Sequence, residues 1–123
     1  MGDAPDGLLA YTADGTMIGI MGRSDRRPFS ADDVTGGSDA ERARAFASIV
    51  AYGGSYEVAG DFVIHHVEAS LFPNLIGTEQ GRRWELDETG RHLTLTSPPL
   101  ILAGSTRVQR LRWERVAREG SED

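Results

Sequence analysis

The densest group of residues that could do chemistry lies between Asp61 and Gln80. This stretch holds two of the three histidines of the chain, His65 and His66, together with Glu68 and several apolar side chains. Imidazole and carboxylate groups act as acids, bases or metal ligands, and their surroundings set their pKa values. The stretch is therefore the first candidate for a functional site.

Residues 62–70 are rich in β-branched and aromatic side chains and are predicted to form a strand. Alternate side chains of a strand share a face, so His65 points to one side and His66 to the other. Two histidines on opposite faces cannot bind one metal ion, and no metal is expected. His65 is the inward candidate for an acid or base. The alternative is a buried histidine bonded to a backbone carbonyl or a cross-strand partner.

A second strand is predicted at Glu79–Asp87, where Gln80, Arg82 and Trp84 share one face. An arginine and a glutamine that point inward could orient a carboxylate or an enolate, and Trp84 supplies a flat apolar surface. Arg82 is the second catalytic candidate, and Gln80 and Trp84 are ligand-binding candidates. In the alternative interpretation Arg82 is a structural ion-pair partner of Glu68 or another acid.

Three further residues are ligand-binding candidates: Tyr56, Glu68 and Phe72. The Tyr56 hydroxyl could donate a hydrogen bond to a ligand oxygen, although such tyrosines more often fill core or rim space. Phe72 belongs to the apolar loop 72–77, which is expected to pack down either as a lid over a cavity or as a plug. Trp113 is assigned to the core.

Turn signals divide the chain into short strands. An Asp-Gly pair joins Gly7–Tyr11 to Met17–Met21 in a predicted hairpin. A capping box at Ser38 starts a helix predicted at Asp39–Ala51. The other strands are expected at Ser55–Val58, Phe62–Ser70, Glu79–Asp87, His92–Thr96, Leu100–Leu102 and Thr106–Val116. About eight strands with hairpin-like links and one short helix predict an all-β antiparallel barrel.

The composition limits the classes of function. The 123 residues predict one domain, 1–123, with residues 1–6 and 118–123 flexible. A net charge of -6 argues against nucleic acid, and no apolar run is long enough to span a membrane. No secretory signal is visible, so the expected location is the cytoplasm. Cys and Lys are absent, which excludes thiolate and lysine chemistry, and the arginine-only basic residues are typical of a high-GC bacterial source.

Several segments together resemble the bacterial and fungal lipocalin-like domain family. The residues that carry the resemblance are 7–17 (GLLAYTADGTM), Phe46 with 51–58 (AYGGSYEV), 65–68 (HHVE), 72–80 (FPNLIGTEQ) with Arg82, 93–95 (LTL) and Pro98-Pro99. They cover nearly the whole chain in the order of the family. The resemblance implies a calycin-type antiparallel barrel with a central cavity, related in architecture to allene oxide cyclase-like barrels. It supplies no catalytic set to carry over.

Family members usually begin with a strand that holds a Gly-x-Trp element, whereas only Met1–Asp6 precede the first hairpin here. A barrel without that strand has an open edge, and open edges pair with other chains. A homodimer, or an incompletely closed barrel, is therefore expected.

Two main functions remain open from the sequence. The first is a cyclase or isomerase that encloses a hydrophobic, polyketide-like metabolite, with His65 as acid or base and Arg82 with Gln80 as the polarising pair. The second is a carrier that sequesters a hydrophobic metabolite without chemistry. A third is a structural partner whose interior is filled by its own side chains. No cofactor is expected in any of them.

Overall fold

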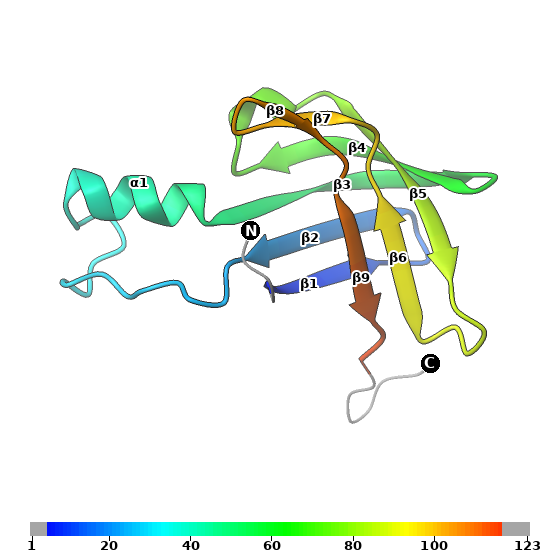
Figure 1. Cartoon of the computed structure of the whole chain (residues 1–123), viewed down its shortest axis with the longest axis horizontal. Coiled ribbons are helices and arrows are strands. Elements are labelled where there is room, and N and C mark those ends of the chain that lie inside the picture. Colours follow the sequence, from blue (N-terminus) through cyan, green and yellow to red (C-terminus); the bar gives the residue numbers. More distant parts are fainter. Residues whose placement is uncertain (1–4, 117–123) are drawn as a thin grey trace. The chain divides into compact units, whose positions relative to one another are not determined.

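The computed structural model describes residues 5–116, and in this part it contains nine strands, one α-helix and a short 3-10 helix (Figure 1). Seven strands form one sheet in the order β1-β2-β3-β4-β5-β6-β9, and β7 pairs with β8 in a second sheet. The tail predicted to be flexible, residues 118–123, lies outside the described residues, as do residues 1–4. The elements are β1 (Asp6–Tyr11), β2 (Thr16–Gly22), α1 (Asp39–Ala47), β3 (Ile49–Ala59), β4 (Phe62–Ser70), η1 (Pro73–Leu75), β5 (Glu79–Leu86), β6 (His92–Thr96), β7 (Leu100–Leu102), β8 (Ser105–Arg107) and β9 (Arg110–Glu114).

The chain divides into two compact units. The first comprises Met1–Ser55 and His66–Thr78, and the second comprises Tyr56–His65 and Glu79–Asp123. Strands β3 and β4 therefore contribute one end to each unit.

In the first unit, β1 and β2 form the predicted hairpin, and β2 pairs with the start of β3. Gly15 takes the positive φ of 93° that the turn requires, and the Thr12 hydroxyl donates a hydrogen bond to the Asp14 carboxylate beside it. Met17 and Met21 of β2 are 2% and 8% exposed and supply buried apolar volume of this unit.

Helix α1 begins where the sequence predicts but ends four residues earlier, at Ala47 instead of Ala51. Its capping box is present, because Ser38 Oγ accepts from the Glu41 backbone N–H and the Glu41 carboxylate accepts from the Ser38 N–H. The helix ends because Ile49 and Val50 are β-branched and pair with Gly22 and Met21 of β2. No side chain of α1 is buried.

β3 is longer than the predicted Ser55–Val58 because Gly53 and Gly54 continue the strand instead of breaking it. A Cβ on Gly54 would lie 1.9 Å from the His66 carbonyl oxygen of β4, so only glycine allows the backbones to approach this closely. The two glycines are therefore packing residues of the sheet.

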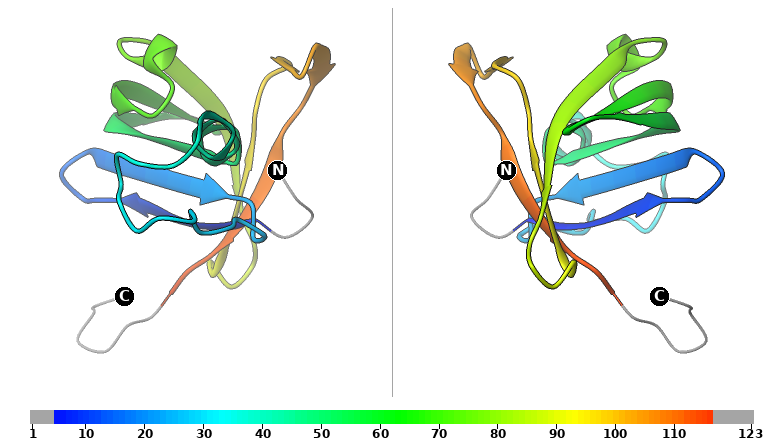
Figure 2. Two further views of the ribbon diagram at one scale, coloured as in Figure 1. Left: turned by 90° about the vertical axis from the view of Figure 1, so that its left-hand side faces the viewer. Right: turned by 90° about the vertical axis from the view of Figure 1, so that its right-hand side faces the viewer.

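In the second unit, β6 lies between β5 and β9 (Figure 2). Directly paired residues share a face, so Trp84, Leu95 and Leu111 form one cross-strand row. A second row on the same face consists of Leu86, Leu93 and Trp113. We call this apolar side of β5, β6 and β9 the inner face of the second unit, since Leu95 is only 6% exposed.

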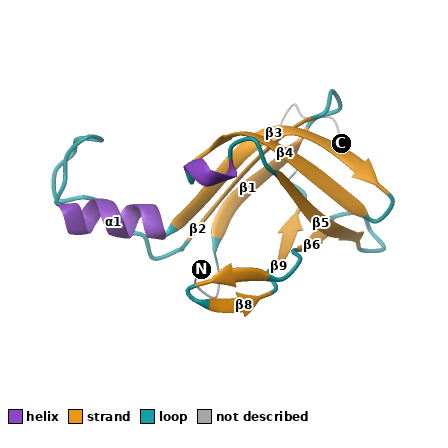
Figure 3. Ribbon diagram, turned by 90° about the horizontal axis from the view of Figure 1, so that it is seen from above, coloured by secondary structure: helices purple, strands orange, loops and turns teal. Residues whose placement is uncertain are grey.

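The single strand predicted at Thr106–Val116 is wrong, because the chain here forms two strands in different sheets. β7 and β8 make a hairpin whose turn places Ala103 and Gly104 at φ values of 51° and 80° (Figure 3). The chain then breaks at Val108 before β9 begins. The break is held by Gln109, whose N–H donates to Ser97 Oγ at 2.8 Å and whose carbonyl accepts from the Ser97 N–H at 2.8 Å.

Candidate functional site

Strand β4 shows the alternation that the sequence predicts around its histidines. Val63, His65 and Val67 are 4%, 2% and 3% exposed, whereas His66 is only half-buried. An imidazole buried between two valines is desolvated, which favours its neutral form. His65 is thus the buried histidine of β4, as expected from the alternation of side chains along the strand.

The charge state of His65 follows from its surroundings. Burial, together with a smaller effect of the positive charge of Arg82, lowers the pKa of His65 to about 4. At neutral pH the imidazole is therefore uncharged, with one nitrogen able to donate a hydrogen bond and the other able to accept one. A neutral imidazole suits ligand binding by hydrogen bonds.

Arg82 is half-buried on β5 and places one guanidinium nitrogen, Nη1, 2.8 Å from the carbonyl oxygen of Gly81. Within residues 5–116, no carboxylate lies within ion-pair distance of this guanidinium. The alternative interpretation, an ion pair of Arg82 with Glu68 or another acid, is therefore wrong for this part of the chain. Most of the donors of Arg82 remain available to a ligand oxygen.

The other candidates on β5 and β3 are half-buried. Gln80, Arg82 and Trp84 lie on the same face of β5. The residues between and beside them point to the other face, where Glu79, Arg83 and Glu85 are exposed and Gly81 is half-buried. Trp84 Nε1 donates to the Gly60 carbonyl at 3.0 Å, so the indole N–H is used in the β3–β4 turn while the ring faces Leu95 in the cross-strand row. Tyr56 of β3 is half-buried as well.

Glu68 and Phe72 are placed differently from the other candidates. Glu68 is exposed and has the strand parity of His66, so it points away from the face of β4 that carries His65. Phe72 is 49% exposed in the apolar loop between β4 and β5, where η1 forms a single turn after it. The structure does not bring these two side chains to the buried face of β4.

One polar group on the inner face was not singled out from the sequence. Trp113 Nε1 is buried and has no hydrogen-bond partner among the described residues. Buried N–H groups are nearly always bonded, and a group left without a partner marks a place for a ligand or an ordered water. The apolar alternation of β9 assigned Trp113 to the core, whereas the side chain as a whole is half-buried, and core packing does not explain its buried N–H.

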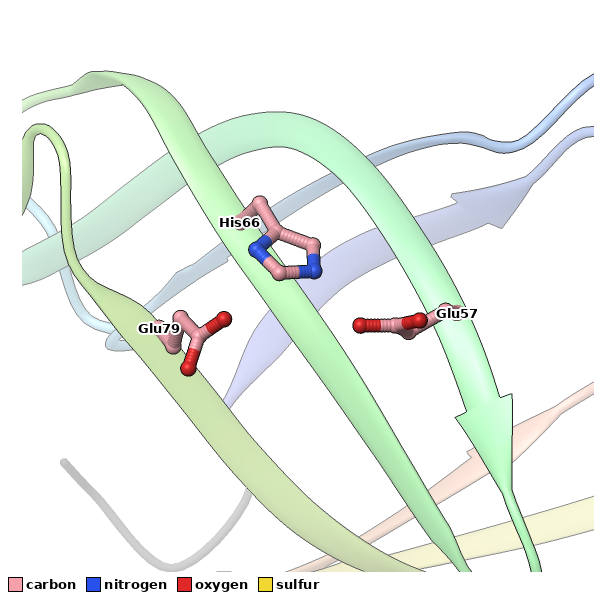
Figure 4. Close-up of side chains that lie close together, drawn as sticks. All are labelled: Glu57, His66 and Glu79. Carbon is pink, nitrogen blue, oxygen red and sulfur yellow. The ribbon is translucent and has the colours of Figure 1, made fainter.

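His66 lies on the face of β4 opposite to His65, and Figure 4 shows it with Glu57 and Glu79. His66 belongs to the first unit and the two glutamates to the second, and we assign no ligand to them.

The third histidine, His92, serves a turn of the second unit. Its Nδ1 lies 2.7 Å from Asp87 Oδ2, and its Nε2 lies 3.2 Å from Glu114 Oε1. Asp87 also accepts hydrogen bonds from Thr89 and from the backbone N–H of Arg91. The hydrogen bond from His92 is the largest cause of the low pKa of Asp87, which stays ionised well below its usual range. This cluster closes the β5–β6 turn.

Strands that follow one another through a sheet, with an apolar face that carries a few polar groups, define a class of antiparallel β-barrels suited to binding small molecules. The family model of the lipocalin-like domain matches residues 1–116 of the sequence. The chain therefore belongs to the lipocalin-like family. The all-β antiparallel fold class and the family resemblance seen in the sequence are confirmed. The comparison with curated proteins gives no match. No helix within residues 5–116 has the length and apolar character needed to cross a membrane.

Proposed function

We propose that the chain binds an apolar small molecule with a carbonyl or carboxylate oxygen on the inner face of its second unit. The observation that carries this proposal is Arg82, a half-buried guanidinium that has no acidic partner among residues 5–116 and lies beside a buried neutral imidazole. A guanidinium recognises a carboxylate through two parallel hydrogen bonds. The leucine and tryptophan rows of β5, β6 and β9 supply the apolar surface for the rest of the ligand.

The unpartnered N–H of Trp113 supports a second point of attachment on the same face. A ligand that carries an acceptor atom there would satisfy this donor, whereas a hydrocarbon would leave it unpaired. The proposal therefore specifies a ligand with at least one oxygen, held by the polar groups and enclosed by apolar side chains. Gln80 and Tyr56 are the further candidates for contact with it.

The carrier role is favoured over catalysis by the charge state of His65. A general base works best when its pKa lies near the working pH, and the pKa of about 4 makes His65 a weak base at neutral pH. The second candidate is the cyclase or isomerase acting on a polyketide-like metabolite. It is favoured by the arrangement of a neutral imidazole near a guanidinium, in which Arg82 would stabilise an enolate and His65 would take up the proton.

The binding proposal is tested by titrating the protein with 2-naphthoate and with 2-naphthamide while tryptophan fluorescence is recorded. Both tryptophans, Trp84 and Trp113, belong to the proposed inner face, so a ligand bound there changes their emission. Arg82→Gln should weaken 2-naphthoate binding by about tenfold or more and the amide much less. The matched control is Arg83→Gln, one residue away on the exposed face of β5.

Equal losses in Arg82→Gln and Arg83→Gln would contradict the proposal, because they would indicate a general charge effect. Turnover separates the two candidate functions. A compound that binds with Arg82-dependent affinity and is recovered unchanged supports the carrier, whereas isomerisation that is lost in His65→Gln supports the enzyme.

We also propose a homodimer formed through the first unit. β1 is the first strand in the order of the large sheet, with β2 as its one partner strand among residues 5–116. Leu8, Ile18 and Ile20 are 60%, 62% and 40% exposed, and Leu8 and Ile20 are direct partners across β1 and β2. Exposed edges and apolar surfaces favour association. Light scattering should give twice the chain mass, and Leu8→Lys should return the mass to that of a monomer.

A further inference from the structure

The first unit contains a pocket of about 700 Å³ between helix α1 and the segment that leads into it. Its walls come from the segment 23–29, which runs beside the helix (Figure 1), and from α1 with the residue after it, Ser48. The lining includes four arginines and two acids. This excess of positive charge is local, because the chain as a whole carries a net charge of -6.

Hydrogen bonds fix the lining segment against the helix. Arg26 Nε donates to the buried Ser48 Oγ at 2.9 Å, and Arg26 Nη2 reaches the Ala45 carbonyl at 3.3 Å in the last turn of α1. The Ser30 N–H donates to the Glu41 carboxylate at 2.9 Å. These bonds connect the segment to both ends of the helix, so the walls of the pocket are preformed.

Both acids of the lining are already engaged. Asp25 accepts two hydrogen bonds from Arg23, each of 2.8 Å. Glu41 accepts from the backbone N–H groups of Ser38 and Ser30. Arg27 adds a weaker electrostatic attraction to Asp25, but among residues 5–116 neither carboxylate accepts a hydrogen bond from Arg27 or Arg44.

Two arginines of the lining, Arg27 and Arg44, form no hydrogen bond or ion pair within the part of the chain that is described. Arg27 comes from the segment before the helix and Arg44 from the last turn of α1. Guanidinium groups bind carboxylates and phosphates through paired donors. Phe29 and Pro28 give the same pocket an apolar wall, and the Phe29 ring is seated on Gly37, where a Cβ would come within 2.5 Å of it.

We propose that this pocket is a second binding site, for a small organic anion whose phosphate or carboxylate is held by Arg27 and Arg44 and whose flat apolar part lies on Phe29. The site consists only of residues of the first unit and is independent of the ligand proposed for the inner face of the second. The pocket is large enough to admit a compound with a single aromatic ring. Its positive charge favours anionic compounds over neutral and cationic ones.

The test is isothermal titration of the full chain with phenyl phosphate, benzoate and inorganic phosphate at low and at physiological ionic strength. Phenyl phosphate should bind with a Kd of about 0.1 to 1 mM and more tightly than inorganic phosphate, because only the former reaches Phe29. Benzoate compares carboxylate with phosphate as the preferred anion. Failure of the native chain to bind any of the three would overturn the proposal.

The decisive variant is the double replacement Arg27→Gln and Arg44→Gln, which should weaken phenyl phosphate binding by at least about tenfold. Its matched control removes the same charge from the second unit by Arg91→Gln and Arg107→Gln, and should leave the affinity within about twofold. An equal loss in the control pair would show non-specific attraction and would refute the site.

Three readouts keep the result separate from folding and from the inner-face ligand. The NMR signals of the Arg27 and Arg44 side-chain Nε–H groups should shift on addition of phenyl phosphate, which reports the site without any mutation. Phe29→Leu should reduce the advantage of phenyl phosphate over inorganic phosphate. The shifts of the Arg27 and Arg44 signals should persist in Arg82→Gln, because they report this pocket alone, so that the failure of one proposal is distinguishable from the failure of the other.

Discussion

The carbonyl oxygen of His66 occupies the space that a side chain on Gly54 would need. A Cβ at residue 54 would lie 1.9 Å from this oxygen and 3.0 Å from the backbone nitrogen of Glu68. Both neighbours are backbone atoms and cannot turn aside as a flexible side chain would. The close approach of β3 to β4 within the first unit therefore depends on a residue without a Cβ.

Gly54→Ala should destabilise the protein by several kcal/mol, on the order of 3 kcal/mol or more, or prevent folding. Gly81→Ala is the matched control, since Gly81 is also a strand glycine and nothing lies within 4 Å of the Cβ position there. Urea denaturation monitored by tryptophan fluorescence measures both. A Gly54→Ala protein as stable as Gly81→Ala would contradict the close approach.

Burial of His65 predicts a loss of stability in mild acid. The unfolded chain takes up a proton on this residue near its ordinary pKa of 6.5, whereas the folded pKa is about 4. The neutral imidazole therefore contributes its full stabilisation above pH 6.5, and this contribution, on the order of 3 kcal/mol, is lost as the pH falls towards 4. Urea unfolding at pH 7.5, 5.5 and 4.5 should show the loss.

The variant His65→Gln should flatten this pH dependence, because it removes the titrating group from the buried face of β4. His66→Gln serves as the control, since His66 is half-buried on the opposite face. The explanation fails if His65→Gln retains the whole loss of stability between pH 7.5 and 4.5.

The turn between β7 and β8 holds one residue in a strained backbone conformation, which a substitution by glycine would relieve. Ala103 is the non-glycine residue with positive φ among residues 5–116, at 51°, and a Cβ in this region costs roughly 1 kcal/mol. Ala103→Gly should therefore raise the free energy of unfolding by up to about 1 kcal/mol, and Ala103→Val should lower it. Thermal unfolding of the three proteins checks the order, which would be reversed if the turn had negative φ at this residue.

The mutual hydrogen bonds of Ser97 and Gln109 should stabilise the break between β8 and β9. Ser97→Ala removes the acceptor of the Gln109 N–H and should cost about 1 to 2 kcal/mol, because Ser97 is 5% exposed and water reaches the site poorly. Ser105→Ala, at an exposed position of β8, should be nearly neutral. Hydrogen exchange of the Gln109 amide should quicken in Ser97→Ala alone.

Local sequence patterns predicted the elements where pattern and pairing agree. The Asp-Gly turn, the capping box of α1 and the burial of His65 follow from rules that act within a few residues. The end of α1 did not, because Ile49 and Val50 fit a helical period but gain more by pairing with β2. The split between β8 and β9 depends on Ser97, which lies twelve residues from its partner Gln109.

The candidate site, like the fold, could be predicted only in part from the sequence. The alternation of side chains placed Arg82 on the side of β5 that carries Gln80 and Trp84, but it could not show that the guanidinium has no acidic partner in the described part of the chain. It could not reveal the unpartnered Trp113 N–H either, since hydrogen-bond satisfaction depends on neighbours from other strands. The arginine pocket could not be predicted, because the segment 23–29 has no hydrophobic periodicity. Only the fold shows which of its arginines lie against α1.

Gly22 and Ile49 are direct partners across β2 and β3, although the whole segment with α1 lies between them. The two ends of that segment are therefore adjacent, and the helix it contains buries no side chain. A short hairpin turn could replace residues 23–48 while the strand register stays the same. Residues 23–48 could therefore be removed to give a smaller scaffold, or they could be exchanged for another binding loop.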